Sequence, residues 1–249
     1  MKRYPIRSRA RGFSLVELLV VTSIIAMLVA IVAPSLRRAM ELTKRATCMA
    51  GLKVIADGFH QYGMENKRFL PPAPPVSDEG ISIWTIWDGT NYFGAGLMVE
   101  LGYVSSPKAL YCPSWSNSKY EYGSSTGWPK SGDPAAESQA TTGYSYHYRA
   151  SFDGSEMDMA GKPKYRTANM DTDPSDEVIM SDGFTMLGSK PAVKYHHREG
   201  YNVLRLDKSG KFLHDTTNAI ADEELGETAW SDFETDIWSG YFKNGLPGS

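Results

Sequence analysis

The sequence predicts an α+β fold in which one long N-terminal helix packs on a small antiparallel-sheet domain. An apolar run from Phe13 to Ala33 is followed by apolar residues at three- and four-residue steps as far as Tyr62, which is a helical period. Short segments between residues 144 and 214 are typical of strands. A tight turn at residues 207–210 joins two of them as an antiparallel hairpin.

The N-terminus combines a basic head with the apolar run. Residues 1–12 hold five basic residues and no acid, which favours a cytoplasmic N-terminus: Lys2, Arg3, Arg7, Arg9 and Arg11. The run over residues 13–33 is long enough to cross a bilayer as a helix, which takes about 20 residues. The sequence holds no second run of that kind, so we expect a single-pass anchor.

Glu17 is the only charge in the apolar run, and an unpaired carboxylate inside a membrane costs at least ~2.5 kcal/mol. The residues after Ala33 make a poor signal-peptide cleavage site, whereas Gly12 is a small residue directly before the run. A cut after Gly12 would remove the basic head and leave the membrane helix on the mature chain.

Residues 12–17 (GFSLVE), the basic leader and Pro34 together resemble the processing site of type IV pilins and type II secretion pseudopilins. The resemblance implies that prepilin peptidase cuts between Gly12 and Phe13 and methylates the new amino group of Phe13. It also implies that Glu17 of one subunit meets this amino group on a neighbour, so that the pair selects the register of assembly. A contact between Phe13 and Glu17 within one helix is the alternative.

We expect one helix over about residues 13–65, roughly 80 Å long. Its transmembrane part is 13–33 and its periplasmic part is 34–66, and a globular domain follows at 67–249. Pro34 should kink the helix or leave it locally open. Three glycines either allow close approach of a strand or another subunit, or let the helix fray: Gly51, Gly58 and Gly63.

The globular domain should hold short elements joined by loops. We expect an extended linker at 69–75, a short helix at 91–101 capped by Gly102, a strand or turn at 109–113, a loop at 114–142, strands at 144–148, 177–181, 201–206 and 211–214, and a C-terminal amphipathic helix through 230–241. In the hairpin turn, Gly210 is the residue expected at positive φ.

Segments 48–53, 59–62 and 68–72 are similar to the pilin-like proteins abundant in planctomycetes, which carry a histidine, nine residues, then Asp-Gly. Here His197 and Asp207 fit that spacing, but Lys208 stands in place of the glycine.

Other chemical motifs in the chain are weak. Residues 123–127 match G-x-S-x-G, but Trp-Pro follows, which favours a loop over a nucleophile on a strand-to-helix turn. His196 and His197 are adjacent and would point to opposite faces of a strand, and no H-E-x-x-H or paired C-x-x-C exists, so we expect no zinc site. His197 is expected to hydrogen-bond Asp207 or a loop backbone.

Three carboxylates, Asp171, Asp173 and Asp176, lie close together in the sequence. Calcium prefers such oxygen ligands, and the resemblance to type II pseudopilins raises calcium as an alternative, but the spacing is not that of an EF-hand, so we favour a solvated acidic turn. We expect no other cofactor. The six tryptophans and fourteen tyrosines either fill the core, which we favour, or form a binding surface.

The two cysteines are expected to form a disulfide. Cys48 lies about 50 Å along the helix from Phe13, beyond the membrane, and Cys112 lies in the globular domain. In an oxidising periplasm two cysteines more often pair than stay free, so we expect Cys48 to pair with Cys112, with two buried free thiols as the alternative.

The net charge and the expected single-pass anchor reduce the number of function classes that fit the sequence. The chain has 249 residues and a net charge of −3, and loss of the leader leaves 21 basic and 29 acidic residues, a net charge of −8, which argues against nucleic-acid binding. We expect a non-enzymatic subunit of a type IV pilus or a type II secretion pseudopilus, anchored in the bacterial inner membrane with its domain in the periplasm. Its partners would be prepilin peptidase and other pilin-like subunits. The alternative is a membrane-tethered domain that binds a ligand such as polysaccharide.

Overall fold

The computed structural model describes residues 13–72, 75–76, 80–81, 85–115, 121–129, 133–134, 142–149, 166–183, 197 and 199–215. The chain divides into two compact units, Met1–Thr43 and Lys44–Ser249, which are considered separately. The predicted leader at 1–12 and the predicted C-terminal helix through 230–241 lie outside the described residues.

Helix α1 (Leu15–Glu65) continues without a break through Pro34, so the long predicted helix is confirmed. Within the first unit every residue from 13 to 32 is exposed. Within the second unit one face of α1 is buried, because the domain packs around it: Arg45, Cys48, Leu52, Ile55, Ala56, Gly58, Phe59 and Gly63. The helix ends where Lys67 and Arg68 adopt positive φ and the Arg68 amide donates to the Gly63 carbonyl oxygen at 2.8 Å.

The remaining elements are short. They are β1 (Pro75–Val76), β2 (Gly80–Ile81), β3 (Thr85–Trp87), α2 (Gly94–Glu100), a 3-10 helix (Pro107–Leu110), β4 (Thr142–Gly143), β5 (Tyr146–Tyr148), β6 (Val178–Asp182), β7 (Gly200–Arg205) and β8 (Gly210–His214). Gly102, at φ +78°, follows α2 and its amide donates to the Val99 carbonyl, so the predicted helix and its cap are confirmed.

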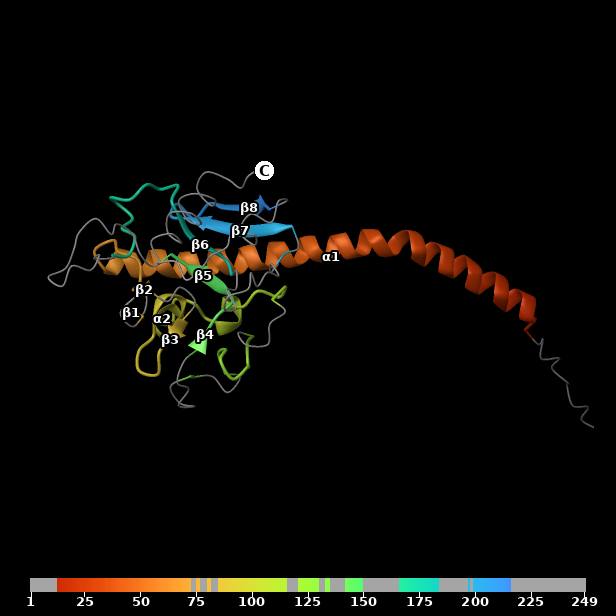
Figure 1. Cartoon of the computed structure of the whole chain (residues 1–249), viewed down its shortest axis with the longest axis horizontal. Coiled ribbons are helices and arrows are strands. Elements are labelled where there is room, and N and C mark those ends of the chain that lie inside the picture. The colour runs from red at the N-terminus through yellow and green to blue at the C-terminus, as the bar shows by residue number, and fades with distance from the viewer. Residues whose placement is uncertain are drawn as a thin grey trace, which may run out of the picture. The chain divides into compact units, whose positions relative to one another are not determined.

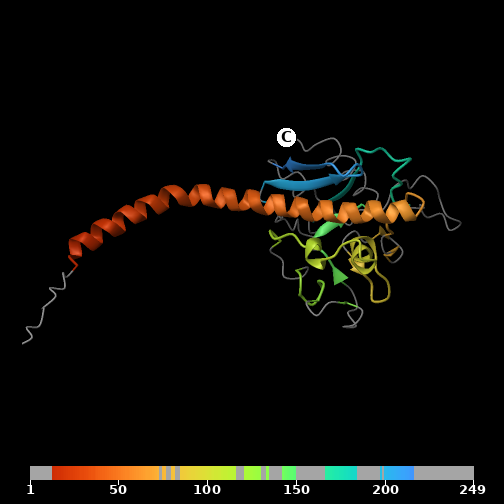
Figure 2. The same cartoon turned by 180° about the vertical axis from the view of Figure 1, so that it is seen from behind.

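Strands β5, β6, β7 and β8 form one antiparallel sheet in that order, and β1–β2 and β3–β4 form two separate pairs. Within the second unit, strands β7 and β8 lie on one side of α1, and α2 and β3 lie on the other, as both views show (Figures 1 and 2). The predicted strands at 177–181, 201–206 and 211–214 are confirmed as β6, β7 and β8. Of the strand or turn expected at 109–113, the turn is confirmed, because the segment begins inside the 3-10 helix Pro107–Leu110. The strand expected at 144–148 forms only from Tyr146.

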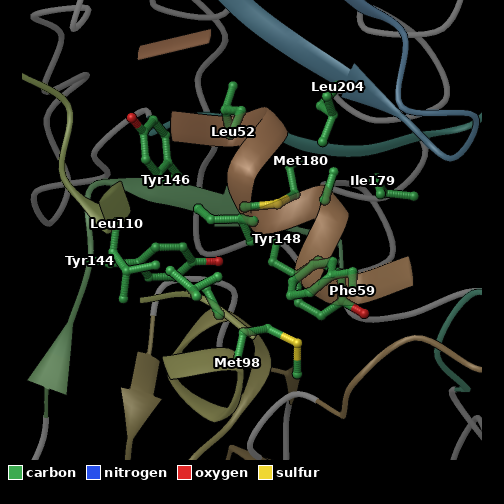
Figure 3. Close-up of a cluster of buried hydrophobic side chains, with 14 of the residues drawn as sticks. Leu52, Phe59, Met98, Leu110, Tyr144, Tyr146, Tyr148, Ile179, Met180 and Leu204 are labelled. Atoms are coloured by element: carbon green, nitrogen blue, oxygen red, sulfur yellow. The ribbon is translucent and has the colours of Figure 1, made fainter. Parts of the chain in front are cut away.

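Aromatic and aliphatic side chains together fill the core around α1 (Figure 3). Buried aromatic residues among those described include Phe59, Trp87, Trp128, Tyr144, Tyr146, Tyr148 and Tyr201. The Phe59 and Tyr148 rings lie 4.8 Å apart between centroids, which joins α1 to β5. The expectation that aromatics build the core is therefore confirmed for these residues.

The turn between β7 and β8 corrects one expectation. Lys208, not Gly210, adopts positive φ, at +66°. This is the position where the histidine-nine-Asp-Gly pattern has glycine, so the left-handed backbone persists although a lysine occupies it. The turn is closed by the Arg205 amide donating to the Ser209 carbonyl oxygen at 2.9 Å.

The glycines of α1 differ in what surrounds them. A Cβ at Gly51 would lie 2.8 Å from both the Ala109 carbonyl oxygen and the Tyr146 hydroxyl oxygen. At Gly58 it would lie 3.2 Å or more from side-chain atoms of Val104 and Met98. Gly51 thus allows a close approach of two segments of the domain to α1, as one of the two interpretations predicted.

Candidate functional site

The first turn of α1 is closed by Ser14 and Glu17. The Ser14 amide donates to Glu17 Oε2 at 2.9 Å, and the Val16 amide donates to Ser14 Oγ at 3.3 Å. This is the reciprocal capping arrangement of a Ser-x-x-Glu sequence. The Ser-x-x-Glu spacing is a sequence signal for this capping contact. The contact considered above from the sequence is instead between Phe13 and Glu17, which are four residues apart.

The helix that begins here presents an apolar surface. Phe13 is 74 % exposed, and the side chains after it stay exposed through Val32. Glu17 is the only charged side chain between Phe13 and Leu36. Among the described residues, α1 is the one helix long and apolar enough to cross a membrane. Gly12, on the other side of the predicted cleavage site, lies outside the described residues.

The expected disulfide between Cys48 and Cys112 is present, with the Cα atoms 5.1 Å apart. Cys48 lies on the buried face of α1, and Cys112 lies just after the 3-10 helix. The Tyr146 hydroxyl donates to the Cys48 carbonyl oxygen at 3.3 Å, and the Cys112 amide donates to Ser145 Oγ. The bond therefore ties α1 to a segment 64 residues away that also contacts β5.

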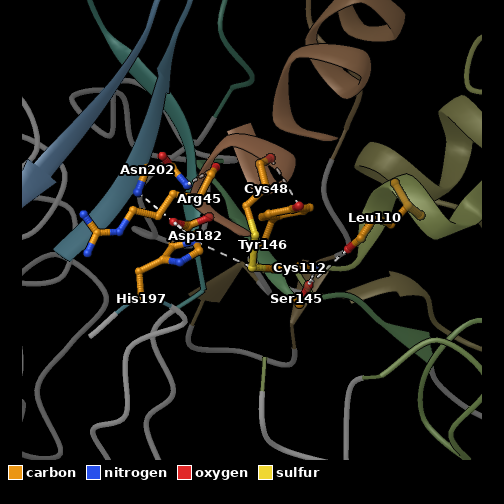
Figure 4. Close-up of a disulfide and its surroundings, with 9 residues drawn as sticks. All are labelled: Arg45, Cys48, Leu110, Cys112, Ser145, Tyr146, Asp182, His197 and Asn202. Atoms are coloured by element: carbon orange, nitrogen blue, oxygen red, sulfur yellow. Dashed lines mark hydrogen bonds and ion pairs between the residues drawn. A yellow bond between two sulfur atoms is a disulfide. The ribbon is translucent and has the colours of Figure 1, made fainter. Parts of the chain in front are cut away.

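A buried histidine and a buried aspartate lie beside the disulfide (Figure 4). His197 Nε2 is 3.4 Å from Asp182 Oδ2 and 3.7 Å from Cys112 Sγ. His197 and Asp182 are both fully buried, and the Asn202 amide donates to Asp182 Oδ2 at 2.7 Å. One ligand atom from each of Cys48, Cys112, Asp182 and His197 lies within 4.8 Å of the other three.

Sequence patterns did not predict this cluster. His197 lies beside Asp182 at the end of β6, not beside Asp207 as one expectation had it. Asp207 instead accepts a hydrogen bond from the Ser209 amide at 2.7 Å, and contacts with Ser209 lower the pKa of Asp207. The four residues form no short sequence motif, because they lie far apart in the chain. Cys48 lies on α1, Cys112 after the 3-10 helix, Asp182 in β6 and His197 before β7.

The predicted calcium carboxylates contact arginines. Asp173 accepts hydrogen bonds from Arg166 at 2.5 and 2.6 Å, and Asp171 lies 3.5 Å from Arg68. Burial raises the pKa of Asp173, but the hydrogen bonds from Arg166 and from the Asn169 amide outweigh burial, so its pKa is lowered. Asp176 is exposed in the same turn. Calcium binding at these residues stays a prediction.

The G-x-S-x-G segment forms a turn between residues 121 and 128, not a strand-to-helix turn. The Gly123 amide donates to the Trp128 carbonyl oxygen at 2.7 Å, which closes the turn. Ser125 is exposed at its tip. The loop interpretation is confirmed.

Comparison with known families identifies a methylation motif at the N-terminus. Residues 7–33 match the model described as a prokaryotic N-terminal methylation motif. The motif indicates a pilin-like protein that prepilin peptidase processes. It covers the end of the basic leader, Gly12, Phe13, Glu17 and the exposed apolar part of α1. No curated protein and no solved structure matches the chain. The methylation motif and the apolar helix together support membrane anchoring and a pilin-like assembly.

Proposed function

We propose that the chain is a structural, non-enzymatic subunit of a type IV pilus or a type II secretion pseudopilus. The observation that carries this proposal is Glu17, the only charge on an exposed apolar helix that lies within a methylation motif. In this proposal the apolar helix anchors the chain in the inner membrane and then packs with other subunits, while the domain stays on the periplasmic side. A buried disulfide fits that compartment, since disulfides persist where the environment is oxidising.

Cleavage supplies the partner that Glu17 needs. A free α-amino group on Phe13 would be largely cationic near neutral pH, because its ordinary pKa is about 8. A carboxylate has two oxygens and accepts several hydrogen bonds. Glu17 Oε2 is used by the Ser14 amide, so Oε1 is the atom that would receive the amino group of a neighbouring subunit. The capping contact would thereby orient the carboxylate for assembly.

The same geometry provides a control for the test. Glu17→Val removes both the capping contact and the assembly contact. Ser14→Ala removes the hydrogen bond from the Val16 amide to Ser14 Oγ but keeps the carboxylate, at a cost to the helix end of about 1 kcal/mol. If Glu17 acts in assembly, only the valine variant should lose filaments.

The experiment compares both variants with the unchanged chain in cells that have an active prepilin peptidase. Mass spectrometry of membrane extracts should show an N-methylated Phe13 terminus in all three proteins. Filaments recovered by shearing, or subunit cross-links formed in membranes, should be lost for Glu17→Val and kept for Ser14→Ala. Normal assembly of the valine variant would refute the role of Glu17, and an intact Met1 terminus would refute the processing step.

A further inference from the structure

We propose that the chain binds one zinc ion when the Cys48–Cys112 bond is reduced. The ligands are the two cysteine thiolates, His197 Nε2 and Asp182 Oδ2. The proposal concerns the globular domain alone and does not depend on the proposed filament role.

Two distances in the cluster match those of a tetrahedral zinc site. A tetrahedral zinc ion with bonds of about 2.0–2.3 Å holds neighbouring N and O ligand atoms about 3.3 Å apart and neighbouring S and N atoms about 3.6 Å apart. His197 Nε2 lies 3.4 Å from Asp182 Oδ2 and 3.7 Å from Cys112 Sγ. Two ligand pairs of the tetrahedron thus already have the separation that zinc requires, and Cys48 Sγ lies within 4.8 Å of the other atoms.

The ligand chemistry and the surroundings also suit zinc. Two thiolates, one imidazole and one carboxylate form a closed four-ligand set of the kinds that zinc accepts. All four residues are buried, so water would not compete for the metal. The Asn202 amide holds Asp182 Oδ2 at 2.7 Å, as outer hydrogen bonds commonly orient metal ligands. Asn202 is itself fixed, since its Nδ2 donates to the Arg45 carbonyl oxygen on α1 at 3.3 Å.

Cys48 and Cys112 can either form the disulfide or bind zinc as thiolates, but not both at once. Zinc binds thiolates, so the disulfide form lacks two of the four ligands. Oxidation by a small-molecule disulfide would form the Cys48–Cys112 bond and pass two electrons to the oxidant. The oxidant would be cleaved to two thiols, which take up two protons, while Zn²⁺ leaves without a redox change. In either form α1 stays attached to the segment at Cys112, so zinc would hold the domain together before the disulfide forms.

The test uses the full-length chain in detergent, as the disulfide form and after reduction with a phosphine that is then removed under argon. Zinc is titrated against a chromophoric chelator. The reduced chain should bind one zinc ion per molecule, and the disulfide form should bind none at this site. Zinc X-ray absorption of the reduced, unmutated chain should report two sulfur ligands and two nitrogen or oxygen ligands. A folded reduced chain that binds no zinc, or zinc without sulfur ligands, would overturn the proposal.

Two variants identify the other ligands. His197→Gln and Asp182→Asn should each weaken zinc binding at least about tenfold. Loss of a group that only hydrogen-bonds a metal ligand already lowers metal affinity by about 10–100-fold, and loss of a ligand should cost no less. His60→Gln is the matched control, because His60 is a partly buried histidine whose Nε2 contacts the Leu206 carbonyl oxygen at 2.8 Å, outside the cluster. Near-ultraviolet circular dichroism checks that each variant is folded. A folded His197 or Asp182 variant with unchanged affinity overturns the assignment of that ligand, and an unfolded variant leaves the absorption measurement to decide.

Discussion

Replacing Gly51 by alanine tests whether α1 is held in place by close backbone contact. An alanine Cβ at this position would lie 2.8 Å from the Ala109 carbonyl oxygen and 2.8 Å from the Tyr146 hydroxyl oxygen. Ordinary contact begins at 3.4 Å, so each oxygen would have to move away from α1 by about 0.6 Å, and a close-packed core resists such a movement. One of the two atoms belongs to the backbone and cannot rotate away.

The expected magnitude follows from three contributions. Overpacking of a core costs about 1–3 kcal/mol. Displacing Tyr146 also weakens its hydrogen bond to the Cys48 carbonyl oxygen, which is worth about 1 kcal/mol. Alanine recovers about 1 kcal/mol through its higher helix propensity. We therefore expect Gly51→Ala to lower the free energy of unfolding by about 2 kcal/mol, which lowers Tm by about 4–8 °C for a domain of this size.

Gly58→Ala is the matched control on the same helix. Its new Cβ would lie 3.2–3.4 Å from side-chain atoms of Val104 and Met98, which can shift by a few tenths of an ångström. The gain in helix propensity should offset that adjustment, so the free energy of unfolding should change by less than about 1 kcal/mol. Thermal and urea unfolding of the detergent-solubilised chain, followed by near-ultraviolet circular dichroism, compares the two variants. Equal effects at the two positions, or a Gly51→Ala chain more stable than the parent, would refute the close-contact argument.

Three further predictions concern the disulfide, a buried histidine and the hairpin turn. Replacing Cys48 and Cys112 together by alanine should lower the free energy of unfolding by about 4 kcal/mol, because the bond closes a 64-residue separation. Urea unfolding without reductant compares the variant with the unchanged chain, and equal midpoints for the two proteins would contradict the prediction. Burial lowers the pKa of His147 from 6.5 to about 3. The unfolded chain therefore takes up a proton that the folded chain does not, and stability should fall by up to about 1.4 kcal/mol per pH unit as pH drops from 6.5 towards 3. Urea midpoints at pH 7 and 5 should converge in His147→Gln, and an unchanged difference would exclude this histidine as the cause. Lys208→Gly should be about 1 kcal/mol more stable than Lys208→Ala, because both lose the 3.0 Å ion pair with Asp57 but only glycine relieves the positive φ; thermal unfolding compares them, and equal Tm values would contradict the strain.

The sequence was sufficient wherever the determining interactions are local. The apolar period predicted α1 because helical hydrogen bonds join residues four apart, and Pro34 did not break it. The methylation motif is contiguous and includes Gly12, Phe13 and Glu17, so its residue order alone is enough to identify it. The alternating segments predicted β6, β7 and β8, and the tight turn predicted the pairing of β7 with β8 because pairing across such a turn is nearly local.

Tertiary structure decided what depends on residues far apart in the chain. Cys112 and His197 are 85 residues apart, and the backbone paths of the sheet, α1 and the 3-10 helix bring them to 3.7 Å. No spacing rule could reveal that contact, since it arises from packing and not from periodicity. The turn at Lys208 shows the same limit at short range. Glycine propensity favoured Gly210, but the pairing register of β7 and β8 placed the left-handed residue at Lys208. The sequence alone thus predicted the long apolar helix, the methylation motif and the pairing of the two cysteines, whereas only packing around α1 brought His197 and Asp182 to that pair.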